Sequence, residues 1–107
     1  MTDLSRARTR ARERARTVGV VAEAADEQAT LAAISRALDV PAYYAADLDA
    51  LAACLRDLSW LPVGPVELIW VDGPLRDADP RTHQRIASTL DGACRPDGER
   101  PFRVTRV

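Results

Sequence analysis

The chain holds few of the residues that carry metal, redox or nucleophilic chemistry. It has one histidine, His83, and two cysteines, Cys54 and Cys94, which lie forty positions apart. A single histidine excludes the paired-histidine chemistry of many nucleases, and two such distant cysteines match no metal-ligand spacing. We therefore expect no metal and no cofactor, and we expect both cysteines to be small buried apolar side chains.

Signals for membrane insertion, secretion and catalysis are also missing. No apolar run reaches the roughly 18 residues that a membrane-spanning helix needs. The first residues lack the apolar segment of a signal peptide. The sequence offers no nucleophile paired with a base and no glycine-rich loop for a phosphate. We expect a soluble cytoplasmic protein that is not an enzyme.

Lysine is absent, and the fifteen basic residues are all arginines with an uneven distribution. Residues 1–17 hold six arginines against two acidic residues, whereas the remainder holds nine arginines against fourteen acidic residues. An arginine at every second position spreads around the whole circumference of a helix and leaves no apolar face for docking. We expect residues 1–17 to be a flexible basic extension, either disordered or a solvated helix, ahead of a domain at 18–107.

Two interpretations of this extension are open. Its arginines could make weak, sequence-independent contact with nucleic-acid phosphates. Alternatively, it is a solvated extension without a partner, or the product of a start codon chosen too far upstream.

Three strand-like segments are separated by helices. The strand segments are 18–21, 66–71 and 102–107, and the helices begin at Asp26, Asp47 and Asp79, which are good N-caps. Pro41 ends the first helix, because the residue before a proline leaves helical geometry. Strands separated by helices pair in parallel, since a parallel return needs a crossover. The sequence therefore predicts an α/β fold: one small domain with a three-stranded parallel sheet packed by helices.

The most distinctive stretch is residues 41–55, which is PAYYAADLDALAACL in one-letter code. It resembles the signature of the barstar family of ribonuclease inhibitors, P-x-Y-Y-G-x-N-L-D-A-L-W-D-C-L. The positions that agree are Pro41, Tyr43, Tyr44, Leu48, Asp49, Ala50, Leu51, Cys54 and Leu55. The order of strands and helices is also similar to that of the family. The resemblance thus implies a barstar-like fold.

The resemblance also implies a function, the inhibition of a small secreted microbial ribonuclease of the barnase type by an intracellular immunity protein. Such a nuclease presents basic residues to RNA phosphates. Carboxylates on a rigid helix can occupy the same positions and plug the active site. The family's contact positions fall here on Tyr43, Ala45, Asp47, Asp49, Ala53 and Trp60. The implied partner is therefore a basic protein.

The stretch departs from the family at four positions. Ala45 replaces a glycine, Asp47 an asparagine, Ala52 a tryptophan, and Ala53 the helix aspartate that usually dominates inhibition. Asp57 lies one helical turn beyond Ala53, and we consider it a candidate for the missing carboxylate. The alternative function is a barstar-like interaction module that has lost barnase-type inhibition and binds another basic protein.

Several of these residues have a structural role as the alternative. Asp47 suits a helix N-cap, and Asp49 favours a first helical turn through the helix dipole. Trp60 could close the core, and His83 shares a helix face with apolar residues, which is typical of a side chain at the rim of a core. Asp91 is the nearest candidate for a further family carboxylate.

Overall fold

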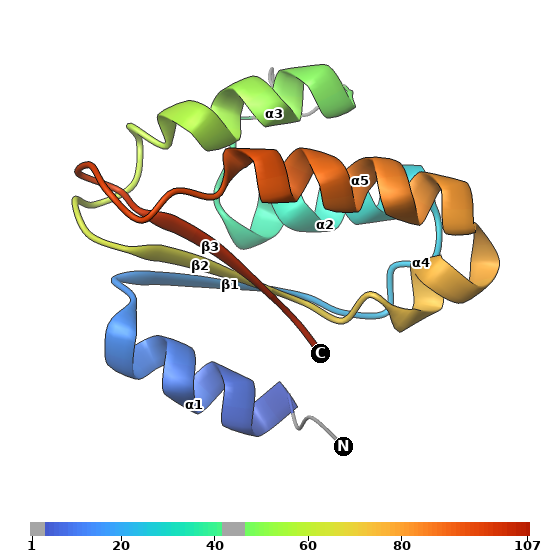
Figure 1. Cartoon of the computed structure of the whole chain (residues 1–107), viewed down its shortest axis with the longest axis horizontal. Coiled ribbons are helices and arrows are strands. Elements are labelled where there is room, and N and C mark those ends of the chain that lie inside the picture. Colours follow the sequence, from blue (N-terminus) through green and yellow to red (C-terminus); the bar gives the residue numbers. More distant parts are fainter. Residues whose placement is uncertain (1–3, 42–46) are drawn as a thin grey trace.

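A three-stranded parallel sheet separates two helical layers of unequal size (Figure 1). This computed structural model describes residues 4–41 and 47–107. In chain order its elements are α1 (Leu4–Arg14), β1 (Thr17–Val21), α2 (Glu27–Ala37), α3 (Leu48–Asp57), β2 (Val66–Trp70), α4 (Gly73–Ala78), α5 (Pro80–Ala93) and β3 (Phe102–Arg106). Helices α2, α3 and α5 lie on one face of the sheet, and α1 lies on the other.

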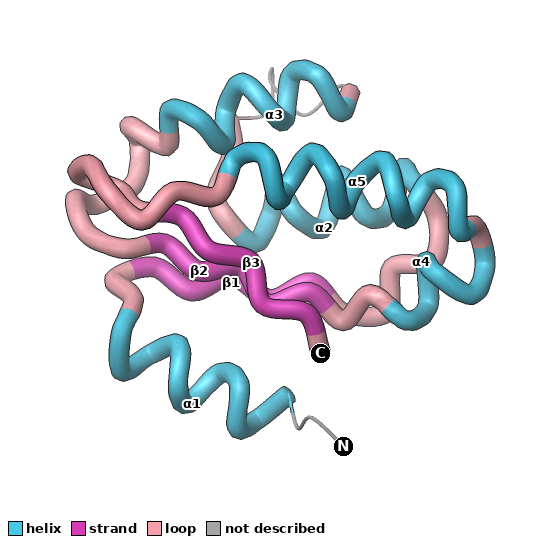
Figure 2. The backbone as a smooth tube through the Cα atoms, viewed as in Figure 1, coloured by secondary structure: helices cyan, strands magenta, loops and turns pink. Residues whose placement is uncertain are grey.

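The sheet has the strand order β1-β2-β3, and both pairs of strands are parallel. At its centre Leu68 of β2 is in register with Gly19 of β1 and Val104 of β3. Figure 2 shows the three strands side by side, with the helices above and below them. The predicted α/β fold with a three-stranded parallel sheet is confirmed.

The main core lies between the sheet and the larger helical layer. All five residues of β2 are buried, as a central strand covered on both faces requires. Leu68 and Trp70 belong to this core together with Ile34 of α2, Leu55 of α3 and Leu90 of α5. Burial of apolar surface, at about 25 cal/mol per Å², is the main force that holds α3 and α5 on the sheet.

Helix α2 approaches β1 closely at Gly19. A Cβ atom at this position would lie 2.8 Å from the carbonyl oxygen of Ala37 and 2.9 Å from its Cβ atom. These separations are shorter than van der Waals contact, so any larger residue would push α2 away from the sheet.

The three predicted N-caps are confirmed. Asp26, Asp47 and Asp79 each accept a hydrogen bond from the backbone N–H three residues later, at 2.7, 2.7 and 3.2 Å. Each carboxylate satisfies one of the N–H groups that the first helical turn leaves without a partner. Hydrogen bonds from Thr82 lower the pKa of Asp79, because they favour its charged form.

Two helical details differ from the sequence prediction. Helix α2 ends at Ala37, ahead of Pro41, because the chain turns through a positive φ of 53° at Asp39. The short helix α4 was not predicted; its six residues lie between β2 and the cap of α5.

Helix α1 corrects the prediction that residues 1–17 have no face for docking. Ala7 and Ala11 are buried and form a second, smaller apolar cluster with Ile69 of β2. Alanine is small enough for the helix backbone to approach the sheet, so two alanines suffice where the arginine pattern indicated no apolar stripe. The division of the chain at residue 17 stays a prediction.

An ion pair between the partly exposed Arg14 and the buried Glu67 fixes α1 to the centre of the sheet. Glu67 of β2 is 1% exposed. Its two carboxylate oxygens accept hydrogen bonds from Nε and Nη2 of Arg14, both at 2.8 Å, and a third from the Thr105 hydroxyl at 2.7 Å. Burial by itself raises the pKa of Glu67, but the bonds from Arg14 and Thr105 outweigh it and the pKa is lowered. The same pairing raises the pKa of Arg14.

The cysteines are both free, but only one matches the prediction. Cys54 is buried in the core, whereas Cys94 is exposed. Helix α5 ends at Ala93, and Cys94 follows it with extended backbone angles. In the part of the chain that the structure describes, no helix is long and apolar enough to cross a membrane.

Candidate partner-binding face

Helix α3 presents its buried and exposed residues on opposite sides. Leu51 and Leu55 are buried, whereas Asp49, Ala53 and Asp57 are all exposed. The three exposed residues are four positions apart, so they follow one line along the helix. The expected stripe is therefore present, with a carboxylate at each end and a methyl group between them.

The two acidic residues at the ends of the stripe have different local environments. Asp49 lies in the first turn, where the helix dipole favours a negative charge. Asp57 is the last helical residue, and its Oδ2 accepts a hydrogen bond from the Ser59 hydroxyl at 2.8 Å. Leu58 then ends the helix in a left-handed conformation with φ of 54°. A carboxylate at this end gains nothing from the helix dipole, and the bond from Ser59 is its one hydrogen bond among the described residues.

Asp47 combines the two roles that the sequence left open. Its side chain is exposed, and its Oδ1 accepts the cap hydrogen bond from the Ala50 N–H at 2.7 Å. A capping carboxylate retains its charge, so it can also attract a basic partner. Of the other predicted contact residues, Tyr43 and Ala45 lie outside the described residues.

Trp60 is half-buried and packs against the main core. Its indole Nε1 donates a hydrogen bond to the carbonyl oxygen of Leu38 at 2.9 Å, which ties the end of α3 to the end of α2. The predicted core-closing role is therefore present. Only the exposed part of the ring is left for contact with a partner.

A groove of about 880 Å³ lies beside Asp47 and Asp49. It runs between α3, α5 and the start of α2. Its lining residues are Glu27, Asp47, Leu48, Asp49, Arg81, Gln84, Arg85, Ser88 and Thr89. One wall thus carries carboxylates and the opposite wall arginines.

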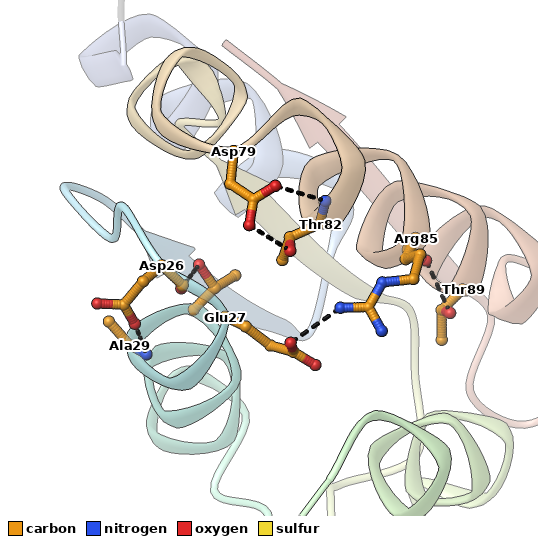
Figure 3. A network of polar contacts seen from close by, with 8 residues as sticks. Asp26, Glu27, Ala29, Asp79, Thr82, Arg85 and Thr89 are labelled. Carbon is orange, nitrogen blue, oxygen red and sulfur yellow. Dashed lines mark hydrogen bonds and ion pairs between the residues drawn. The ribbon is translucent and has the colours of Figure 1, made fainter.

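The arginines of this groove are functional candidates that the sequence analysis missed. Figure 3 shows Arg85 of α5 reaching Glu27 at the start of α2, and the Nη2 to Oε2 distance is 2.9 Å. Arg81 is exposed and forms no ion pair with the described residues. The spacing of Arg81 and Arg85, four apart on a helix, was the available signal, since such residues share a face.

Asp91 does not join this groove. Both of its carboxylate oxygens accept from Nη2 of Arg106 on β3, at 2.8 and 2.7 Å. The guanidinium partly neutralises the carboxylate, so Asp91 is a weak candidate for a further acidic contact.

His83 is a structural residue at the edge of the core. Its ring stacks on Trp70 with centroids 5.1 Å apart, and its Nε2 lies 2.9 Å from Oδ2 of the buried Asp72. The pair links α5 to the end of β2, as expected of a histidine at the rim of the core.

Comparison with known proteins agrees with this architecture. The family model described as Barstar (barnase inhibitor) matches residues 4–106, which include α1 and all three strands. No curated protein and no solved structure matches significantly. Since the family match covers nearly the whole chain, the protein belongs to the Barstar (barnase inhibitor) family.

Proposed function

We propose that this protein is an intracellular inhibitor, or immunity protein, of a small secreted microbial ribonuclease. The observation that carries the proposal is the exposed acidic line of α3 in a chain of the barnase-inhibitor family. The inhibitor catalyses nothing, and it acts by covering the nuclease active site.

The physical basis is mimicry of RNA charge. Asp47, Asp49 and Asp57 project from a helix that the core holds rigid, so little conformational entropy is lost when they bind. Asp49 and Asp57 are eight residues apart, which is about 12 Å along the helix. Charge complementarity accelerates the encounter, and desolvated charge-assisted hydrogen bonds slow the release.

The test is residual RNA cleavage by a nuclease mixed with the purified protein. Barnase serves as the first probe, followed by secreted ribonucleases from the source of this chain. D49A and D57A should each weaken inhibition at least tenfold, whereas D77A, which removes an equally exposed carboxylate of α4, should not. Unaltered inhibition by D57A would show that Asp57 does not replace the missing aspartate.

A second candidate function is favoured by Ala53 and by the arginines across the groove. A wholly basic nuclease surface would face a methyl group at position 53 and would be repelled by Arg81. A partner with both basic and acidic groups fits this face better. We therefore retain, as the alternative, an interaction module that no longer inhibits barnase-type nucleases. The substitution R81E replaces the repelling positive charge by a negative one. This alternative is favoured if RNA is fully cleaved in every nuclease mixture and R81E does not restore inhibition.

A further inference from the structure

Helix α1 presents its arginines in two rows. Ala7 and Ala11 face the sheet, and a residue on a helix advances by about 100°. The exposed arginines therefore project about 80° and 120° to either side of the alanine line. One row is Arg6 with Arg10, and the other is Arg8 with Arg12. The outermost ridge between the rows contains Thr9, which is opposite the alanines, and the exposed Glu13 of the last turn lies beside the row of Arg6 and Arg10.

This arrangement opposes helix stability. Within each row the two arginines are four residues apart, where like charges repel each other. Among the described residues the first turn of α1 contains no acidic residue, and it places Arg6 near the positive end of the helix dipole. None of the four arginines forms an ion pair with the described residues. Folding alone therefore does not account for the two rows.

The rows are nevertheless held in place. The Arg14–Glu67 pair anchors the last turn of α1, and the alanines seat it on the sheet. Since α1 lies on the opposite face of the sheet from α3, both surfaces can be occupied independently (Figure 1). A ligand of α1 therefore meets a preformed cationic surface and need not order it.

We propose that α1 binds the phosphate backbones of duplex DNA from the major groove, without reading sequence. A helix with its side chains is about 10–12 Å across, and the groove is about 12 Å wide. One row then reaches the phosphates of one strand, and the second row those of the other. Guanidinium groups suit this role because they bind phosphate oxygens bidentately.

Other polyanions fit α1 less well. The helix contains no aromatic residue on which the bases of a single strand could stack. The major groove of A-form RNA is too narrow to admit a helix with its side chains. An anionic membrane binds amphipathic helices that can insert an apolar face, and the apolar residues of α1 pack against the sheet.

The experiment measures fluorescence anisotropy of a labelled 20-base-pair DNA duplex titrated with the full-length protein at 50–200 mM salt. Four phosphate contacts predict a slope of about −3.6 for log K against log[salt], which is an affinity loss of about 150-fold over this range. R6Q/R10Q and R8Q/R12Q should each halve the slope. The control R36Q/R56Q removes two exposed arginines from other helices and should leave the slope unchanged.

The remaining outcomes overturn the proposal. These are no binding at 50 mM salt, an equal effect of R36Q/R56Q, or tighter binding to single-stranded DNA, to duplex RNA or to anionic phospholipid vesicles. Circular dichroism of each variant verifies that the fold is retained, since glutamine preserves helix propensity. Inhibition of RNA cleavage should be the same for R6Q/R10Q and the unchanged protein, so this test is independent of the proposed inhibitory function.

Discussion

At the residue scale, position on the fold decides what each side chain can contribute. Ala53 is exposed at the centre of the α3 stripe, where a carboxylate would be free to meet a partner. Glu67 is the reverse case, a carboxylate buried at the centre of the sheet and committed to Arg14 and Thr105. One position is thus open to a change of function, whereas the other is needed for stability.

Restoring a carboxylate at position 53 should strengthen inhibition of a barnase-type nuclease. A hydrogen bond to a charged group contributes about 1.5–3 kcal/mol, and tenfold in affinity corresponds to about 1.4 kcal/mol. We expect A53D to lower the inhibition constant for barnase at least tenfold, measured by RNA cleavage. A78D adds the same charge at an exposed position of α4 and should have little effect. An equal gain from both variants would mean that only net charge matters.

The Arg14–Glu67 pair should make stability depend on acid pH. Because the folded-state pKa of Glu67 is lowered, its contribution is present above the ordinary carboxyl value of 4.5 and is lost as the pH falls through the lowered value. We expect R14A to cost about 2–3 kcal/mol at pH 7, less than for a fully buried pair because Arg14 is partly exposed. Urea unfolding at pH 7 and pH 3 measures both effects.

A neighbouring arginine provides the control for that experiment. R12A removes an exposed guanidinium from the same helix and should change the free energy of unfolding by no more than about 0.5 kcal/mol. The double variant R14A/E67Q no longer has a buried carboxylate without its cation. It should therefore recover part of the free energy of unfolding that R14A loses. No difference between R14A and R12A would contradict a stabilising role for the pair.

At the element scale, an aspartate at the start of α2, α3 and α5 defines where each helix begins. Capping hydrogen bonds are local, so the sequence pattern alone predicts them. The end of α2 and the existence of α4 depend instead on backbone turns near the sheet. The cap of α3, Asp47, also belongs to the proposed binding face. Its capping role and its contact role can be separated by experiment.

Replacing Asp47 in two ways should separate capping from partner contact. Asparagine caps as well as aspartate, so D47N should keep stability within about 0.5 kcal/mol, whereas D47A should lose about 1 kcal/mol. Both variants lack the charge and should weaken nuclease inhibition to a similar degree. Thermal unfolding and RNA cleavage provide the two readouts. Unweakened inhibition by D47N would assign Asp47 to capping alone.

At the scale of the whole molecule, α1 completes a second layer that the sheet needs. It covers Ile69 and supplies the guanidinium that satisfies Glu67. The family match from residue 4 also includes this helix. A domain beginning at residue 18 would expose the apolar residue and leave the carboxylate without its cation.

A chain that begins at residue 16 should therefore be less stable than the full chain. Loss of Arg14 alone should cost about 2–3 kcal/mol, the cover that α1 gives to Ile69 is lost as well, and each kcal/mol is worth about 4–8 °C in a domain of this size. We expect the melting temperature to fall by at least about 10 °C. E67Q in the shortened chain should recover part of the loss. Equal melting temperatures would instead support the division of the chain at residue 17.

The sequence by itself determined the elements whose causes are local. Apolar runs specified the strands, aspartates specified the helix starts, and the 41–55 stretch indicated the family. Four-residue spacing also placed Asp49, Ala53 and Asp57 on one exposed line.

Only the tertiary structure decided which distant residues meet. Arg14 pairs with Glu67 and Arg85 with Glu27 although 53 and 58 positions separate them in the chain. Docking of α1 and the mixed charge of the groove depend on such pairs. Periodicity reports on neighbours along one helix or strand, whereas these contacts exist only after the sheet has brought separate elements together.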